Sequence, residues 1–345
     1  MSPRKLRGLL AFKEEIHMNK EDVIIVGGGP CGLAAAIALE NQGFQPLVIE
    51  KGNIVNAVYG YPTHQTFFST SEKLEIGDVP FVSESRKPTR NQALCYYREV
   101  VKRKQLRINT FERVLRIEKK GEQQFIVYTQ MKNGEENSYE SKYIVIATGY
   151  YDNPNYMNIP GEDSHKVMHY FKEAHPYFNT EVAIIGGKNS AVDAALELHK
   201  AGAKSITVLY RGSEFSGSIK PWILPEFESL VRHGHVKMEF KAIVQEITDT
   251  TIVYKVNGEE KVLKNDFVFA MTGYKPDHAF LREMGVGVVE ETGRPLFNPD
   301  TMETNIPGIF IAGVIAAGNN ANEIFIENGR FHGELIAQYL IGHQQ

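Results

Sequence analysis

Cysteine is scarce in this sequence of 345 residues, which contains Cys31 and Cys95 and no other. Two cysteines are too few for a disulfide framework, and without a Cys-x-x-Cys pair the chain has no ligands for a zinc ribbon. This sparing use of cysteine is typical of proteins from a reducing cytoplasm, which is where we expect this chain. We also expect no metal site, and we interpret as structural the histidines that lack metal-ligand spacing, namely His169, His175, His233 and His235.

Charge of one sign and long hydrophobic runs are missing as well. Acidic residues number 42 and basic residues 38, so the chain has no basic field for nucleic acid and no polybasic face for an anionic membrane. The longest apolar stretch, Ile306 to Gly318, contains Pro307 and three glycines, and it is shorter than the roughly 20 residues of a membrane-spanning helix. We therefore expect neither a nucleic-acid partner nor a membrane partner.

The composition that remains is globular, with 42% hydrophobic and 23% charged residues. At roughly 150 residues per domain, the length predicts about two domains. Before Met18, which offers a second start, the apolar run is too short for a signal peptide. We therefore expect residues 1–17 to be a disordered extension.

A glycine-rich turn follows the first apolar run of the chain. Val23 to Val26 is a β-branched run, typical of a strand that is buried on both faces. Gly27, Gly29 and Gly32 then fit the G-x-G-x-x-G spacing, and an alanine-rich segment that favours helix follows them. In this motif the glycines allow a tight turn, close approach of the backbone to a pyrophosphate and close helix packing, while helix N–H groups face the phosphates.

A carboxylate completes this first motif. The strand expected at 46–49 ends in Glu50, 23 residues after Gly27, the usual offset for an acid that binds a ribose hydroxyl. Because a carboxylate also repels a 2′-phosphate, we expect FAD or NAD at this site and not NADP. The candidate contacts at the turn and the strand end are Gly27, Gly29, Pro30, Cys31, Gly32, Glu50 and Lys51.

The pattern returns in altered form in the middle of the chain. A strand expected at 181–185 leads into a second glycine turn, in which Lys188 occupies the place of the middle glycine. The next expected strand, 205–209, is followed by Arg211 in place of an acid, and a guanidinium binds a 2′-phosphate in a bidentate manner. We therefore expect this site to prefer NADPH. Its candidate contacts are Gly186, Gly187, Asn189, Ser190, Ala191 and Arg211.

Two dinucleotide sites in one chain predict an α/β fold with two Rossmann-like domains, the second inserted into the first, and FAD that is reduced by NADPH. The expected boundaries are 18–165 together with 285–345 for the FAD domain, and 166–284 for the NADPH domain. Each domain is expected to carry a β-meander, one around Asn133-Gly134 and one around Asn257-Gly258, because both dipeptides favour hairpins.

Three strand segments resemble those of the thioredoxin reductase superfamily of flavoproteins. Residues 143–149 and 267–277 each run from a strand into Thr-Gly, and 304–313 is similar to the last flavin-contacting strand. The resemblance covers about residues 20–342, with one departure: Val314 stands where an Asp usually follows the last Ala-x-Gly. It adds as flavin contacts Thr148, Gly149, Gly313 and Glu323.

Within that superfamily the chain lacks the redox cysteine pair of thioredoxin reductases. It is more similar to the bacillithiol-disulfide (bacilliredoxin) reductases, and four segments carry this resemblance: 27–32, with a cysteine in the turn, 67–72, 220–225 and 318–330. The resemblance implies FAD, NADPH, and a low-molecular-weight thiol disulfide or a bacilliredoxin-like protein as the substrate. We also expect a homo-oligomer.

Two side chains are candidates for the chemistry, each with a second interpretation. Cys31 lies at a helix N-terminus, where the dipole favours a thiolate that attacks disulfides, yet cysteine also packs there as a small apolar residue. His64 lies in the loop that reaches the flavin in this superfamily and would protonate a leaving thiolate, or it is a surface histidine. Cys95 is expected to pack in the core.

The expected reaction is hydride transfer from NADPH to FAD and then reduction of a disulfide, with Cys31 as the candidate for a mixed disulfide. A ferredoxin- or flavodoxin-NADP reductase remains an alternative, because it shares the fold and also lacks a cysteine pair. A flavin monooxygenase is less favoured, since its uninterrupted second glycine motif is missing. A non-catalytic redox sensor that binds FAD and NADPH is the alternative from another class.

Overall fold

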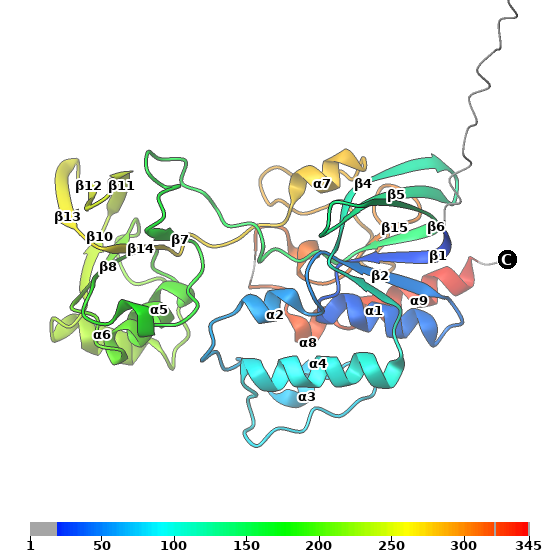
Figure 1. Cartoon of the computed structure of the whole chain (residues 1–345), viewed down its shortest axis with the longest axis horizontal. Helices are drawn as coiled ribbons and strands as arrows, with labels where there is room; N and C mark the ends of the chain where they lie inside the picture. The colour runs from blue at the N-terminus through cyan, green and yellow to red at the C-terminus, as the bar shows by residue number, and fades with distance from the viewer. Residues whose placement is uncertain (1–18, 321, 344–345) are drawn as a thin grey trace, which may run out of the picture.

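The computed structural model describes residues 19–320 and 322–343, so the extension expected at 1–17 lies outside the described residues. The described chain forms two lobes, which two segments of chain connect (Figure 1). No helix within these ranges is long and apolar enough to cross a membrane.

The first lobe contains a seven-stranded sheet of order β3-β2-β1-β6-β5-β4, in which β15 also pairs with β6. Its strands are β1 (Asn19–Val26), β2 (Pro46–Glu50), β3 (Ile108–Thr110), β4 (Glu112–Gly121), β5 (Gln124–Met131), β6 (Glu136–Ile146) and β15 (Ile309–Ile311). β1 lies parallel to β2 and β6, and its apolar end is buried. β4, β5 and β6 form the expected antiparallel meander.

Helices and two short 3-10 turns complete the lobes. The first lobe has α1 (Pro30–Glu40), α2 (Asn56–Gly60), α3 (Ser71–Leu74), α4 (Arg90–Lys104), α7 (His278–Glu283), α8 (Ile326–Gly329), α9 (His332–Gly342) and the 3-10 turn Val314–Ala317. α1 begins at Pro30, a helix position that tolerates the missing N–H. α9 approaches α1 closely because Gly333 faces Ala35, whose Cα would lie 2.4 Å from a Cβ at Gly333.

The second lobe contains a parallel five-stranded sheet of order β10-β9-β8-β14-β7. Its strands are β7 (Val167–Met168), β8 (Glu181–Ile185), β9 (Ser205–Tyr210), β10 (Lys237–Phe240) and β14 (Phe267–Ala270). The expected second meander consists of β11 (Ala242–Ile247), β12 (Thr251–Val256) and β13 (Glu259–Lys264). The helical elements are α5 (Asn189–Lys200), α6 (Leu224–Arg232) and the 3-10 turn His175–Tyr177. Since these strands all lie between β6 and β15 in the chain, the predicted insertion is confirmed.

The two segments that connect the lobes pair with each other. Pro154 and Tyr274 form an antiparallel bridge, and the Asn155 N–H donates to the Gly273 carbonyl at 2.9 Å. The ring of Tyr274 packs on those of Tyr151 and Tyr170, with centroids 4.7 and 5.4 Å away. The two connecting segments are therefore joined to each other by backbone hydrogen bonding and aromatic packing, and they are not independent linkers.

Candidate functional site

The first glycine turn is positioned by tight packing at two of its glycines and is open at the third. Gly27 has φ 109°, and a Cβ there would lie 2.5 Å from the Ala147 carbonyl oxygen. A Cβ at Gly32 would lie 2.0 Å from the Gly27 carbonyl oxygen. A Cβ at Gly29, in contrast, would meet no heavy atom within 4 Å. The open space at Gly29 fits the close approach of a pyrophosphate that the motif predicts.

Glu50 lies beside this turn at the end of β2. Its Oε2 accepts a hydrogen bond from the Gly28 N–H at 2.7 Å, and its Oε1 accepts one from the Gly52 N–H at 2.8 Å. The residue is only 6% exposed, and burial raises the pKa of its carboxyl group, an effect that the two N–H donors oppose. The neighbouring Lys51 instead pairs with Asp152 at 2.9 Å.

An unsatisfied hydroxyl lies on the other side of the turn. Thr148 Oγ1, at the end of β6, is buried and has no hydrogen-bond partner among the described residues. The next residue, Gly149, has φ 68° and open space where a Cβ would be. A buried hydroxyl without a partner is costly, so a bound group that supplies the missing partner would stabilise this place. The residues present therefore fit a dinucleotide.

Cys31, the second residue of α1, packs against two glycines that are distant in the sequence. A Cβ on Gly313 would lie 3.1 Å from the Cys31 Sγ, and one on Gly329 would lie 3.0 Å from it. Burial raises the pKa of the Cys31 thiol to about 12, so the thiol is protonated at neutral pH. Desolvation of the thiolate thus opposes the lowering that the helix N-terminus predicts, and the role of Cys31 stays a prediction.

Sequence reasoning missed His332 at the start of α9. The Gly313 N–H donates to His332 Nδ1 at 3.1 Å, so the neutral imidazole carries its proton on Nε2. Burial lowers the pKa of this histidine and keeps it neutral. No motif or spacing pointed to this residue, because only folding brings α9 to the glycine that follows β15.

Glu323 lies on the surface and is already paired. Its carboxylate binds the guanidinium of Arg294 and accepts a hydrogen bond from Asn320 Nδ2. Glu327, four residues later, pairs with Lys73 at 3.5 Å. Of the predicted contacts in the C-terminal part, Gly313 lies against the α1 N-terminus, whereas the Glu323 carboxylate is committed to an ion pair.

His64 is exposed, as a surface histidine would be, and it lies where the first lobe meets α5. Its Nδ1 is 3.9 Å from Glu197 Oε2, and its ring packs edge-on against Phe171. Desolvation lowers the pKa of His64, while the Glu197 carboxylate opposes this shift. The adjacent Thr63 N–H donates to the Lys172 carbonyl at 2.9 Å. The loop that carries His64 therefore contacts the second lobe through Lys172 and Glu197.

The second glycine turn repeats the geometry of the first at its start. Gly186 has φ 137°, and a Cβ there would lie 2.4 Å from the Met271 carbonyl oxygen. The ring of Tyr210 occupies the space beside Gly187, with Tyr210 Cγ 2.3 Å from the place of a Cβ. Lys188 is exposed and is the N-cap residue of α5, and its side chain forms no capping hydrogen bond.

The other predicted contacts of this turn differ in exposure and in whether their side chains already form hydrogen bonds within the protein. Both polar ends of the Asn189 amide are used: Nδ2 donates to the Ser218 carbonyl and Oδ1 accepts from the Lys220 N–H, each at 2.9 Å. Asn189 thus anchors the loop 218–220. Ser190 and Arg211 are exposed, whereas Ala191 is buried.

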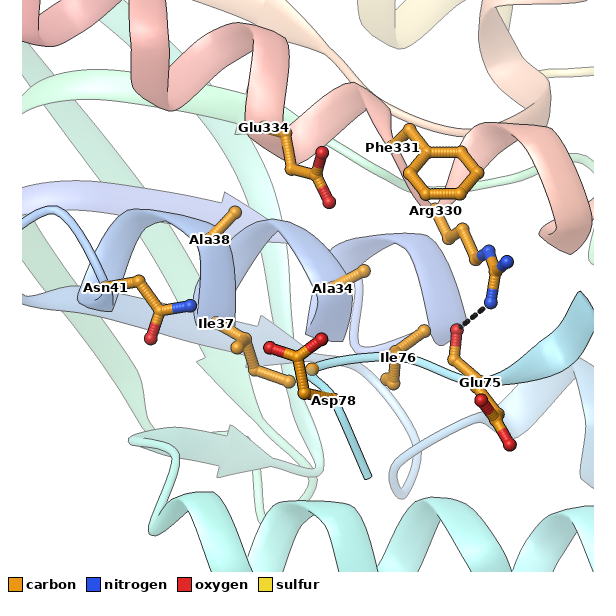
Figure 2. A pocket seen from close by; sticks show the side chains of 11 residues that line it. Ala34, Ile37, Ala38, Asn41, Glu75, Ile76, Asp78, Arg330, Phe331 and Glu334 are labelled. Carbon is orange, nitrogen blue, oxygen red and sulfur yellow. Dashed lines mark hydrogen bonds between the residues drawn. The ribbon is translucent and has the colours of Figure 1, made fainter. Parts of the chain in front are cut away.

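A cavity of about 270 Å³ lies along α1 beyond Cys31, on the side of α8 and α9 (Figure 2). Arg330 closes one end, since its guanidinium donates to the Glu75 carbonyl at 2.5 Å. No residue of either glycine turn lines the cavity, so it is separate from the predicted nucleotide sites. Its lining consists of Ala34, Ile37, Ala38, Asn41, Glu75, Ile76, Gly77, Asp78, Arg330, Phe331 and Glu334.

Comparison with known proteins agrees with this geometry. Residues 24–313 match the family model described as pyridine nucleotide-disulphide oxidoreductase. The chain is 64% identical over 321 residues to the bacilliredoxin reductase Bdr of Bacillus subtilis (strain 168), covering 93% of this chain and 97% of that protein.

Two solved structures of bacillithiol disulfide reductase Bdr are also similar. The one from Bacillus cereus has a TM-score of 0.93 and 67% identity, covering 94% of this chain and 100% of that chain. The one from Staphylococcus aureus has a TM-score of 0.90 and 56% identity, covering 95% and 100%. The predicted fold class and the predicted resemblance are confirmed.

Proposed function

Because this chain belongs to the pyridine nucleotide-disulphide oxidoreductase family, we propose that it uses NADPH and FAD to reduce disulfides that contain bacillithiol. The chain is an oxidoreductase with a disulfide reductase role, in a family that uses flavin and pyridine nucleotide. The observation that supports a bacillithiol disulfide as the substrate is the 64% identity to a bacilliredoxin reductase along 93% of the chain.

In this proposal the first lobe binds FAD through its own backbone and two side chains. The open space at Gly29 admits the pyrophosphate, and the α1 N-terminus directs N–H groups at it. Glu50, which is fixed by two backbone donors beside the turn, would hold a ribose hydroxyl, and Thr148 Oγ1 would find in FAD the partner that it lacks. When bound, FAD supplies the electron pair that reduces the disulfide.

The second lobe selects NADPH by charge. Arg211 follows β9 and Lys188 caps α5, and both are exposed. Neither cation has a carboxylate oxygen within 4.0 Å in the described part of the chain. Two unpaired cations beside a glycine turn suit a 2′-phosphate, which an acid at the same place would repel.

The proposed reaction does not require a covalent intermediate at Cys31. Attack on a disulfide needs the thiolate, and burial between Gly313 and Gly329 keeps the thiol protonated. A covalent route through Cys31 would require its Sγ to leave these glycines first. His64 as proton donor likewise stays a prediction, and the desolvation that lowers the pKa of His64 opposes this role.

The decisive experiment is anaerobic NADPH oxidation by the purified protein reconstituted with FAD, using bacillithiol disulfide as the acceptor. We expect strong stimulation over the rate without acceptor, and a much smaller one with oxidised ferredoxin or flavodoxin. The opposite order would replace the proposal by a ferredoxin or flavodoxin reductase. Slow turnover with every acceptor would instead favour a redox sensor.

The Cys31→Ala variant in the same assay separates the two routes. Retained disulfide reduction means that Cys31 only packs. Loss of disulfide reduction, with FAD content and NADPH-dependent flavin reduction unchanged, places Cys31 on the reaction path.

A further inference from the structure

Three aromatic side chains from separate segments gather on the surface where the lobes meet. Phe68 belongs to the first lobe, Trp222 to the loop before α6, and Phe325 to the segment before α8; they are 38%, 58% and 38% exposed. The rings of Phe68 and Trp222 meet edge to face with centroids 5.8 Å apart. Two lysines lie over these rings, and we call the five residues, including Lys87 and Lys220, the lysine-aromatic patch.

The lysines of the patch are bound to rings and to no acid. Lys87 Nζ lies 4.5 Å from the centroid of Trp222, and Lys220 Nζ lies 5.3 Å from that of Phe68 and 5.9 Å from that of Phe325. Neither ammonium has a carboxylate oxygen within 4.0 Å among residues 19–320 and 322–343, although acidic residues outnumber basic ones in the chain. The patch thus offers two positive charges on an apolar base.

The patch is attached to both halves of the predicted site. The Lys220 N–H donates to Asn189 Oδ1 at 2.9 Å, which ties the loop to the N-terminus of α5. Phe325 directly precedes α8, whose last residue, Gly329, packs against the Cys31 Sγ. A molecule seated on the patch would therefore lie beside both glycine turns.

The exposure of the rings favours a protein over a small molecule as the occupant. Small ligands bind in concave sites that bury most of their surface, whereas these rings are each at least 38% exposed. Aromatic residues are enriched in protein interfaces, and Trp is one of the residue types enriched among hot spots. Trp222 is the only tryptophan of the chain and is more than half exposed.

We propose that the lysine-aromatic patch docks the protein substrate, a bacilliredoxin whose surface around its bacillithiol-bound cysteine is acidic. This rests on the proposed function and adds to it where the protein substrate binds. The rings supply buried apolar area, and the two unpaired ammonium groups pair with carboxylates of the partner, which sets orientation and speeds encounter.

The test compares two acceptors in steady-state NADPH oxidation: a bacilliredoxin that carries bacillithiol in mixed disulfide, and bacillithiol disulfide itself. The variants are Trp222→Ala and the double variant Lys87→Glu with Lys220→Glu. The double variant Lys255→Glu with Lys264→Glu, at exposed lysines of β12 and β13, is the matched charge control. We expect KM for the bacilliredoxin to rise about tenfold or more in both patch variants, with bacillithiol disulfide kinetics and KM for NADPH unchanged. The control should behave as the wild type.

Other outcomes overturn the proposal. Equal losses with both acceptors would assign the patch to the small disulfide, a raised KM for NADPH would assign it to the nucleotide, and a changed oligomeric mass of Trp222→Ala would assign it to a second copy of the chain. Unchanged KM values would leave the patch without a docking role.

Failure of the proposed function is recognised separately. If the wild type reduces neither acceptor, the function is wrong, and the docking site is then judged by the fluorescence of Trp222 during titration with the same bacilliredoxin. The bacilliredoxin chosen contains no tryptophan, and this chain has no other tryptophan, so the tryptophan signal reports on the patch alone. No change in fluorescence at saturating bacilliredoxin would overturn the docking site, and a saturable change that the double variant lacks would support it.

Discussion

The packing of Cys31 against Gly329 gives a prediction whose size follows from the structure. In the Gly329→Ala variant, the new Cβ would lie 3.0 Å from the Cys31 Sγ, 3.1 Å from the Gly313 Cα and 3.1 Å from Ile324 Cγ2. All three distances are shorter than ordinary van der Waals contact, and overpacking of this kind costs about 1–3 kcal/mol. We expect Gly329→Ala to destabilise the protein by about 2 kcal/mol.

The Cys31→Ala variant tests the cause. It removes the Sγ, which costs about 1 kcal/mol on its own as a small buried cavity. In the double variant the closest of the three contacts is gone, so we expect the two effects to be less than additive by about 1 kcal/mol. Gly342→Ala is the control, because a Cβ there would meet no heavy atom within 4 Å.

The assay is thermal release of FAD, followed by flavin fluorescence at saturating FAD so that ligand linkage is equal in all variants. At about 2–4 °C per kcal/mol, Gly329→Ala should lower the midpoint by about 4–8 °C. Strict additivity of the two substitutions would refute the reasoning, since it would mean that the Sγ does not occupy the space beside Gly329.

Three further predictions concern the nucleotide sites and one buried acid. Glu50→Gln leaves an acceptor for only one of the Gly28 and Gly52 N–H groups, so the FAD content of the protein should fall. The FAD content is read from the ratio of visible to ultraviolet absorbance, and full occupancy would contradict the role of Glu50. Arg211→Ala should raise KM for NADPH about tenfold and leave KM for NADH unchanged in steady-state assays, and an unchanged NADPH preference would remove Arg211 from the site. Burial raises the pKa of Asp193 to about 6, so its ionisation costs stability increasingly as pH rises from about 4 to 6. Asp193→Asn removes a penalty of about 3 kcal/mol at pH 7.5 but only about 1 kcal/mol at pH 4.5, so it should raise the melting temperature more at pH 7.5; an equal shift at both pH values would contradict the raised pKa.

Features that depend on neighbouring residues were predictable from the sequence. The turn at 27–32, the acid at Glu50 and the two meanders are set by local spacing, by backbone freedom at glycine and by hairpin dipeptides. The insertion of the second lobe also followed, because two complete strand-turn-helix units had to share one chain. Family resemblance, carried by short motifs, supplied the disulfide reductase role.

Features that depend on solvent exclusion or on contact across the chain were decided only by the tertiary structure. The dipole at the start of α1 predicts a thiolate at Cys31, but Gly313 and Gly329, nearly 300 residues later in the chain, desolvate the sulfur and reverse the shift of its pKa. The resemblance predicts a flavin contact at Glu323, whose carboxylate is bound to Arg294 in the structure. The prediction that Cys95 packs in the core is wrong, because α4 places Cys95 on its exposed side.

The contacts between lobes belong to the same class. Neither the approach of His64 to Glu197 nor that of Phe68 to Trp222 has any signal in spacing, because each joins residues of different lobes that are more than 100 positions apart in the chain. The sequence by itself determined which nucleotide motifs this chain has and in what order they occur along it. The tertiary structure decided which of their side chains are neutral, paired or open to a partner, since desolvation and pairing depend on residues that only folding brings together.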